Sequence, residues 1–96
     1  MSYKVRTIYT KPSADVSLHT PSAEYTALID TFFNAGKITQ KPVESIDGLT
    51  HTYTVIFTRE SDFKDFCINP AASENHNTRQ THCNENSISY SIEQGV

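Results

Sequence analysis

The segment that decides the fold is GLTHTYTVIFTRESDFKDF, residues 48–66. Its first half, 49–58, alternates mostly apolar or aromatic side chains with threonines and one isoleucine, which is the period of a β-strand with two distinct faces. Its second half predicts a helix, because Ser61 can cap the N-terminus and Phe63 and Phe66 follow three residues apart. The segment therefore predicts a two-faced strand that leads directly into a helix.

A hairpin is predicted in front of this strand. Asp47-Gly48 is typical of a type I′ turn, in which both central residues need a positive φ. In the strand before the turn, 37–46, polar residues separate the apolar ones, and Pro42 lacks the N–H that a central strand would use. We therefore expect 37–46 at an edge of the sheet.

The N-terminal third of the chain predicts a strand and an amphipathic helix. Residues 3–9 alternate in the manner of a strand. Thr20 followed by Pro21 predicts the N-cap and first position of a helix, and Gly36 predicts its left-handed end. The helix carries one continuous apolar stripe, made of Tyr25, Leu28, Ile29, Phe32 and Phe33.

The C-terminal part predicts an interrupted helix and a last strand. Asn69-Pro70 is itself a cap and first helical position, so a separate helical segment should run from 70 to about 84 in a new direction. This segment is poor in apolar residues, and we expect it on the surface or under another subunit. Residues 87–93 alternate isoleucine or tyrosine with serine or glutamate and predict the fourth strand.

The predicted order is βαββαβ, and the predicted fold class is α+β. We expect one ferredoxin-like domain over residues 1–96, with a four-stranded antiparallel sheet and the helices on one face. RNA-recognition motifs share this order, but the strand over 49–58 lacks the basic, small and stacking aromatic residues of their RNP1 pattern. A net charge of −3 also opposes phosphate, so we expect no nucleic-acid partner.

The composition favours a small protein that gains from a second copy of itself. Leu, Ile, Val and Phe make up about 22% of the 96 residues, which is a modest supply for a core, and we expect a homodimer. Apolar runs such as 27–29 and 55–57 are only three residues long, and no apolar signal segment opens the sequence, so we expect no membrane partner. Two cysteines without such a signal fit a cytoplasmic protein with free thiols.

The segment 48–66, together with YKVRTIYTKP at 3–12, resembles the small dimeric α/β-barrel proteins, a superfamily that includes antibiotic-biosynthesis monooxygenases, EthD-like proteins and stress-responsive barrel proteins. In these proteins a Thr-rich central strand ends in Phe or Trp, and a serine with an acidic residue and aromatics begins the second helix. The resemblance covers about 90 residues. It implies that two sheets meet face to face across a two-fold axis and close a barrel whose interior is the pocket.

In such a barrel each sheet turns one face to its own helices and the other to the partner sheet. We expect the more apolar set to face the helices: Leu49, Tyr53, Val55, Phe57, Ile88, Tyr90 and Ile92. The opposite set would face the partner: Arg6, Ile8, Thr50, Thr52, Thr54, Ile56, Ser89 and Ser91. The inverse assignment stays open, because His51 shares the apolar parity and would need a hydrogen-bond partner if buried.

His51 is the candidate catalytic residue, because imidazole titrates near neutrality and the strand places it near tyrosines. Tyr9, Tyr53 and Arg6 are the candidate ligand-binding residues. The alternative for His51 is a histidine at a strand end that bonds to solvent or backbone.

The second helical region carries both cysteines and a weak metal pattern. Cys67 follows the aromatic stripe of the first segment and is predicted to be packed, whereas Cys83 lies among polar residues and is predicted to be accessible. His76, Gln80 and Cys83 could share one helix face, but zinc needs more ligands at shorter spacings. We therefore expect no metal and no cofactor.

These observations favour a protein that binds a small molecule in the barrel interior without catalysis. Serine and threonine hydroxyls dominate its polar side chains, and they are weak acids and bases unless a neighbour activates them. The alternative is an enzyme similar to the cofactor-independent monooxygenases, acting on a small aromatic or polyketide-like substrate. His51 would then serve as proton shuttle or oxyanion partner, and Tyr53 and Tyr9 would orient the ligand.

Overall fold

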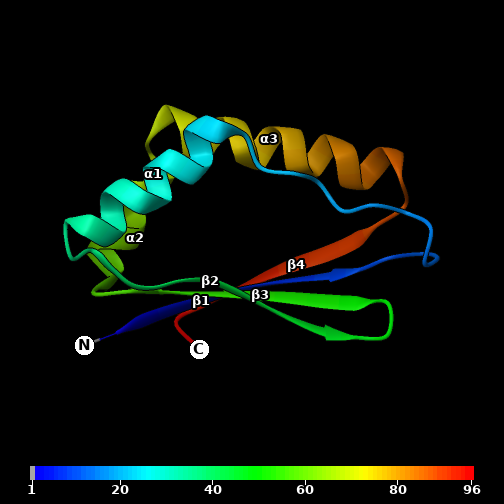
Figure 1. The fold of residues 1–96 in the computed structure, drawn as a ribbon, viewed down its shortest axis with the longest axis horizontal. Coiled ribbons are helices and arrows are strands. Elements are labelled where there is room, and N and C mark those ends of the chain that lie inside the picture. Colours follow the sequence, from blue (N-terminus) through cyan, green and yellow to red (C-terminus); the bar gives the residue numbers. More distant parts are fainter. Residues whose placement is uncertain (1) are drawn as a thin grey trace.

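Antiparallel strands form a single sheet, and the helices lie over one of its faces (Figure 1). The structure is a computed structural model that describes residues 2–96. Its elements are β1 (Tyr3–Thr10), α1 (Ala23–Asn34), β2 (Ile38–Asp47), β3 (Thr50–Phe57), α2 (Glu60–Cys67), α3 (Pro70–Glu85) and β4 (Ser89–Gln94). The four strands are ordered β2-β3-β1-β4, which is the ferredoxin-like arrangement, so the predicted fold class is confirmed. None of the helices in this range is long and apolar enough to cross a membrane.

The strand β2 lies at the sheet edge, as Pro42 predicted, and pairs with β3. The pairing register shifts between Ile38 and Gln40 and again between Gln40 and Val43, next to the proline. Beyond the shifts the ladder is regular and ends with Asp47 opposite Thr50.

The hairpin turn differs from the prediction by one residue. The two residues between the paired Asp47 and Thr50 are Gly48 and Leu49. Of these only Gly48, at φ 60°, has a positive φ, so the loop has the φ pattern of a type II′ turn with glycine first, and the predicted type I′ turn at Asp47-Gly48 is wrong.

The helix α1 begins later than predicted and ends where predicted. Its N-cap is Ser22 and not Thr20, because the Ser22 hydroxyl accepts a hydrogen bond from the Tyr25 N–H at 3.2 Å. At the other end Gly36 has φ 75°, and the N–H of Lys37 donates to the Phe32 carbonyl at 2.9 Å. This is the Schellman ending that a glycine at this position permits.

Two helices connect β3 to β4, separated at Asn69-Pro70 as predicted. The Asn69 side chain accepts from the Ala71 N–H at 3.1 Å, and Pro70 begins α3. The predicted Ser61 cap of α2 is wrong, because the helix already begins at Glu60 and the N-cap is Arg59, whose carbonyl accepts the first helical hydrogen bonds.

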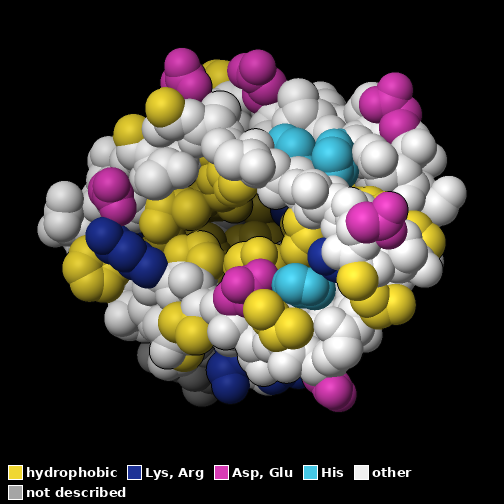
Figure 2. Space-filling model, turned by 45° about the vertical axis from the view of Figure 1, so that its right-hand side comes forward, with side chains coloured by type: hydrophobic (Ala, Val, Ile, Leu, Met, Phe, Trp, Pro, Cys, Tyr) yellow, Lys and Arg dark blue, Asp and Glu magenta, His cyan; other side chains and the backbone are white. Residues whose placement is uncertain are grey.

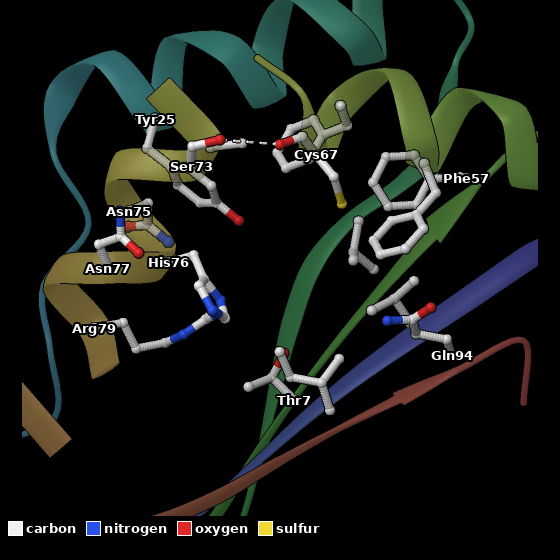
Figure 3. Close-up of a pocket in the computed structure, with 16 residues that line it drawn as sticks. Thr7, Tyr25, Phe57, Cys67, Ser73, Asn75, His76, Asn77, Arg79 and Gln94 are labelled. Carbon is white, nitrogen blue, oxygen red and sulfur yellow. Dashed lines mark hydrogen bonds between the residues drawn. The ribbon is translucent and has the colours of Figure 1, made fainter. Parts of the chain in front are cut away.

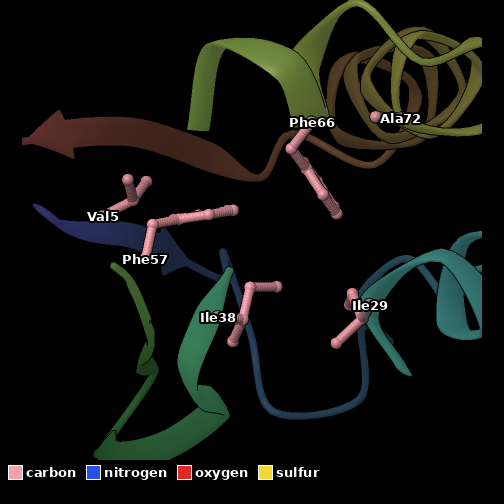
Figure 4. Packing of buried hydrophobic residues seen from close by; sticks show 6 residues of the cluster. All are labelled: Val5, Ile29, Ile38, Phe57, Phe66 and Ala72. Atoms are coloured by element: carbon pink, nitrogen blue, oxygen red, sulfur yellow. The ribbon is translucent and has the colours of Figure 1, made fainter. Parts of the chain in front are cut away.

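Two clusters of buried side chains fill the space between sheet and helices. The larger one joins Phe57 and Val5 of the sheet to the helices, as Figure 4 shows for six of its residues: Val5, Ile29, Ile38, Phe57, Phe66 and Ala72. The smaller one lies toward the other end of α3 and contains Tyr9, Cys83 and Ile88, with Tyr53 and Tyr90 against them. The predicted helix-facing set is therefore confirmed for six of its seven residues: Tyr53, Val55, Phe57, Ile88, Tyr90 and Ile92. The prediction is wrong for Leu49, which lies in the hairpin turn and is exposed. The inverse assignment of the two faces is wrong.

The prediction for the two cysteines is wrong. Cys67 is exposed, because Phe63 and Phe66 supply the aromatic face of α2 that packs on the sheet. Cys83 is only 1% exposed, since it lies on the side of α3 that faces Tyr9 and Ile88. The polar residues around Cys83 in the sequence occupy the outer side of the helix.

Candidate functional site: a cavity between the sheet and α3

The described part of the chain contains a cavity of about 510 Å³ between the sheet and the helices, with a smaller one of about 180 Å³ beside it. Figure 2 shows the molecule hollowed on this side, with hydrophobic side chains lining the hollow. Five residues line both spaces, so the two adjoin: Thr7, Tyr25, Val55, Asn75 and Arg79. The cavity belongs to one chain and lies on the helix-facing side of the sheet.

The cavity exists because α3 has too few large apolar residues to fill the space beneath it. Its buried residues are Ala72, Asn75 and Cys83, which are all small or medium-sized. Opposite them the sheet presents Val5, Val55 and other apolar side chains. A helix held over an aromatic sheet by short side chains leaves a gap that larger residues would close.

The loop between β1 and α1 forms hydrogen-bond contacts with the C-terminal half of α3. The His82 ring Nε2 lies 2.8 Å from the Ser17 carbonyl oxygen, and His19 Nε2 lies 3.1 Å from the Thr78 hydroxyl. His19 and Leu18 of this loop line the smaller cavity. The loop thus forms one wall of the site.

The lining is mostly apolar, with a few polar groups on α3 and the sheet. Its apolar part combines the aromatic rings of Phe57, Phe63 and Phe66 with aliphatic side chains such as Val55 and Ile92. In Figure 3, Tyr25, His76 and Arg79 extend from the helices toward the cavity and face Thr7 on the sheet. Among the residues that line either space there is no aspartate and no glutamate. The formal positive charge of Arg79 is therefore not balanced within the lining.

The guanidinium group of Arg79 is held by neutral neighbours. Its Nη2 donates to His76 Nδ1 at 3.0 Å, and its Cζ lies 5.5 Å from the centroid of the Tyr90 ring. Its Nε is buried without a hydrogen-bond partner, and no carboxylate among residues 2–96 forms an ion pair with it. Arg79 is thus a cation at the cavity wall whose hydrogen-bonding capacity is not used up.

Asn75 lies one helical turn before Arg79 and also lines both spaces. It is only 6% exposed, and its Oδ1 has no hydrogen-bond partner. An enclosed amide oxygen without a partner costs free energy, so the observed orientation of the Asn75 amide is not stabilised by a hydrogen bond at this atom.

A second polar cluster links β2 and β3 at the hairpin end of the sheet. Glu44 Oε2 accepts from the Tyr53 hydroxyl at 2.5 Å and from His51 Nδ1 at 3.0 Å. Because a carboxylate only accepts, His51 carries a proton on Nδ1. Burial, with the adjacent Glu44 hydrogen bond and charge, raises the pKa of Tyr53 to about 12. The hydrogen bonds from His51 and Tyr53 lower the pKa of Glu44.

The structure brings together three of the four residues that the sequence suggested. Tyr9 and Tyr53 both line the smaller cavity, with ring centroids 5.8 Å apart. His51 is the cross-strand partner of Tyr9, but it does not line either space and reaches the site through Glu44 and Tyr53. Arg6 lies on the opposite face of the sheet, where it pairs with Glu93 at 3.0 Å.

Sequence reasoning missed Asn75 and Arg79. The signal was available in their spacing, because Ala72, Asn75, Arg79 and Cys83 recur at the intervals of one helix face. This helix face is hard to recognise in the sequence as the inward-facing one, because it contains no large apolar residue.

Among residues 2–96, no three His, Cys, Asp or Glu side chains gather in a way that could hold a metal ion. His76, considered above for such a site, instead accepts the hydrogen bond from Arg79. The chemistry of the site is thus that of an apolar pocket with one cation and several neutral hydrogen-bonding groups. No protein-family model and no curated protein matches this sequence.

Proposed function

We propose that this protein binds a small, mostly apolar molecule in the cavity between its sheet and α3. The observation that carries the proposal is an aromatic-lined space of about 510 Å³ with a few polar groups on its wall. Small-molecule sites have this size and this lining, in which the apolar surface provides affinity and the polar groups fix orientation. The proposed site lies within one chain and not in the space between two sheets.

The proposal includes a homodimer of the dimeric α/β-barrel type. The helices cover one face of the sheet, and the other face carries Ile8 and Ile56 among threonines and serines. A second sheet would cover this face, as the resemblance of residues 48–66 to that superfamily implies. The ligand site would then occur twice in the assembly.

The first experiment measures binding of phenylnaphthylamine, a neutral apolar dye that fluoresces in apolar surroundings. We expect the wild-type protein to bind it, and Thr7→Phe to weaken binding by about tenfold or more, because a phenyl ring at position 7 would fill space that both cavities share. Thr81→Phe is the matched control, since Thr81 is exposed on α3 and lines neither space.

Two outcomes would contradict the proposed site. One is that the wild-type protein does not raise the fluorescence of the dye, and the other is that Thr7→Phe binds the dye as tightly as Thr81→Phe does. Circular dichroism of each variant establishes that the sheet and helices are retained.

A second candidate is an enzyme similar to the cofactor-independent monooxygenases. The observation that favours it is that Tyr53 lines the smaller cavity and donates its hydroxyl hydrogen bond to Glu44, which also accepts from His51. Tyr53 would contact the substrate, while Glu44 and His51 would position the Tyr53 hydroxyl and accept a proton.

The test is oxygen consumption with anthrone, whose methylene carbon takes up one oxygen atom of O₂ and becomes a carbonyl while the other atom leaves as water. We expect consumption above the rate in buffer and a loss of at least about tenfold in Tyr53→Phe, the range for losing an acid–base group. A rate equal to that of buffer would leave only the binding proposal.

A further inference from the structure

We propose that the cavity selects organic monoanions, an aromatic or aliphatic body carrying one carboxylate or sulfonate, and that Arg79 and Asn75 bind the acid group. This inference rests on the proposed function and specifies the ligand class. The observation behind it is that Arg79, a cation without a counterion in the lining, and Asn75, whose amide oxygen has no partner, lie on the same wall of a mostly apolar cavity.

Arg79 is a cation without a counterion in the lining of the cavity. Natural proteins rarely leave a guanidinium beside an apolar cavity without a counterion, because the loss of hydration is not offset. Here the partners are a neutral imidazole nitrogen of His76 at 3.0 Å and the face of the Tyr90 ring. An incoming carboxylate or sulfonate would supply the missing charge and accept the unused N–H donors of Arg79.

Asn75 lies one helical turn before Arg79 and also lines the cavity. Its side chain is 6% exposed, its Oδ1 is unpartnered, and it lies on the same side of α3 as Arg79. The two ends of an amide exchange places by a flip, so Asn75 can present its NH₂ group to an acid oxygen. The pair would then bind the acid group from two successive turns of one helix.

The charge of Arg79 acts on other groups that line the cavity. Burial raises the pKa of Tyr9 and of Tyr25, and the charge of Arg79 opposes both increases. Both tyrosines line the smaller space, so the field of Arg79 extends across the site. No Asp or Glu lines either space, so the larger space has no carboxylate on its wall; Glu44 lies beside the smaller space, where it accepts a hydrogen bond from Tyr53.

The body of the ligand is set by the rest of the lining. Phe57, Phe63, Phe66 and Val55 surround the larger space and favour an aromatic or branched aliphatic group. An inorganic anion would satisfy Arg79 but would leave this surface uncovered.

The experiment compares two dyes that share the anilinonaphthalene body: neutral phenylnaphthylamine and anilinonaphthalene sulfonate. At neutral pH we expect the wild-type protein to bind the sulfonate about tenfold or more tightly than the neutral dye, in line with a charge-assisted hydrogen bond. Arg79→Gln should abolish that preference and leave the affinity for the neutral dye within about twofold, since the apolar contacts remain.

Asn75→Asp is a more specific test of the anion site than Arg79→Gln, because it places a carboxylate of nearly the same shape as the amide one turn from Arg79. The new side chain would pair with Arg79 and compete with the ligand, so the sulfonate preference should disappear without loss of folding. Lys64→Gln is the charge-matched control for Arg79→Gln, since Lys64 is 71% exposed on α2 and should leave both affinities unchanged.

The outcomes distinguish an error in the anion assignment from an error in the proposed function. Equal affinity of the wild-type protein for the two dyes, or a sulfonate preference that persists in Arg79→Gln, would overturn the anion assignment while leaving the proposed cavity in place. Binding of neither dye would instead overturn the proposed function itself. Displacement of the sulfonate by inorganic phosphate at equal concentration would show that the site takes small inorganic anions and would overturn the organic class.

Discussion

At the scale of single residues, Glu44 is the group on which the hairpin end of the sheet depends. One carboxylate oxygen accepts hydrogen bonds from both Tyr53 and His51, which join the edge strand β2 to β3 through their side chains. This partner is what allows His51 to lie on the helix-facing side of the sheet with a side chain that is only 14% exposed. The histidine on the apolar parity is thus explained by a glutamate seven residues earlier in the sequence.

The hydrogen bonds to Glu44 predict a dependence of stability on pH. They lower the pKa of Glu44 in the folded protein, so their contribution is present above the ordinary glutamate value of about 4.3 and is lost as the pH falls through the folded-state value. We expect wild-type protein to have a higher Tm than Glu44→Gln at pH 7, and the difference to shrink toward about pH 3.

Thermal unfolding followed by circular dichroism at both pH values tests this prediction. The control is Glu74→Gln, which alters an exposed carboxylate on α3 that forms no ion pair in the described chain. A difference between wild type and Glu44→Gln that is the same at both pH values would contradict the role of the ionised Glu44.

At the scale of elements, the strands were predictable and the helix ends were less so. Period-two alternation places β1, β3 and β4 within a few residues of their observed bounds, because one face of each of these strands packs against the helices. The bounds of β2 follow instead from its place before the hairpin turn, since most of its residues are exposed. Cap signals were ambiguous where several candidates stood together. Thr20 and Ser22 are both good caps, and only the bond from the Tyr25 N–H selects Ser22.

The site was less predictable than the fold, and α3 shows why. Its length and its start at Pro70 follow from the sequence, but the absence of large apolar residues gives no indication of which side faces inward. Contact with the sheet decides that Asn75, Arg79 and Cys83 face inward. The same lack of bulk that hid the inner face produces the cavity.

At the scale of the whole molecule, the face of the sheet away from the helices is the main surface without a partner in the chain. Cross-strand pairs put Ile56 of β3 opposite Lys4 of β1, and Ile8 of β1 opposite Thr52, all on this face. On the two central strands, most residues of this face are only partly exposed, and half of them are threonine, which packs well on a pleated surface. This surface is therefore better suited to packing against a second sheet than to burial within a hydrophobic core.

The homodimer can be tested by sedimentation at micromolar concentration, where we expect a species of twice the 10.8 kDa chain mass. Thr54→Lys should shift it to the monomer, because Thr54 lies on β3 opposite Arg6, and the partner sheet would bury the added positive charge next to that arginine. Thr81→Lys adds the same charge to the exposed side of α3 and should leave the dimer intact.

Dye binding distinguishes dimer formation from ligand binding, because a cavity within one chain predicts that monomeric Thr54→Lys retains its affinity for phenylnaphthylamine. A wild-type species of 10.8 kDa would contradict the pairing of two sheets, and loss of dye binding in the monomer would mean that the partner completes the site.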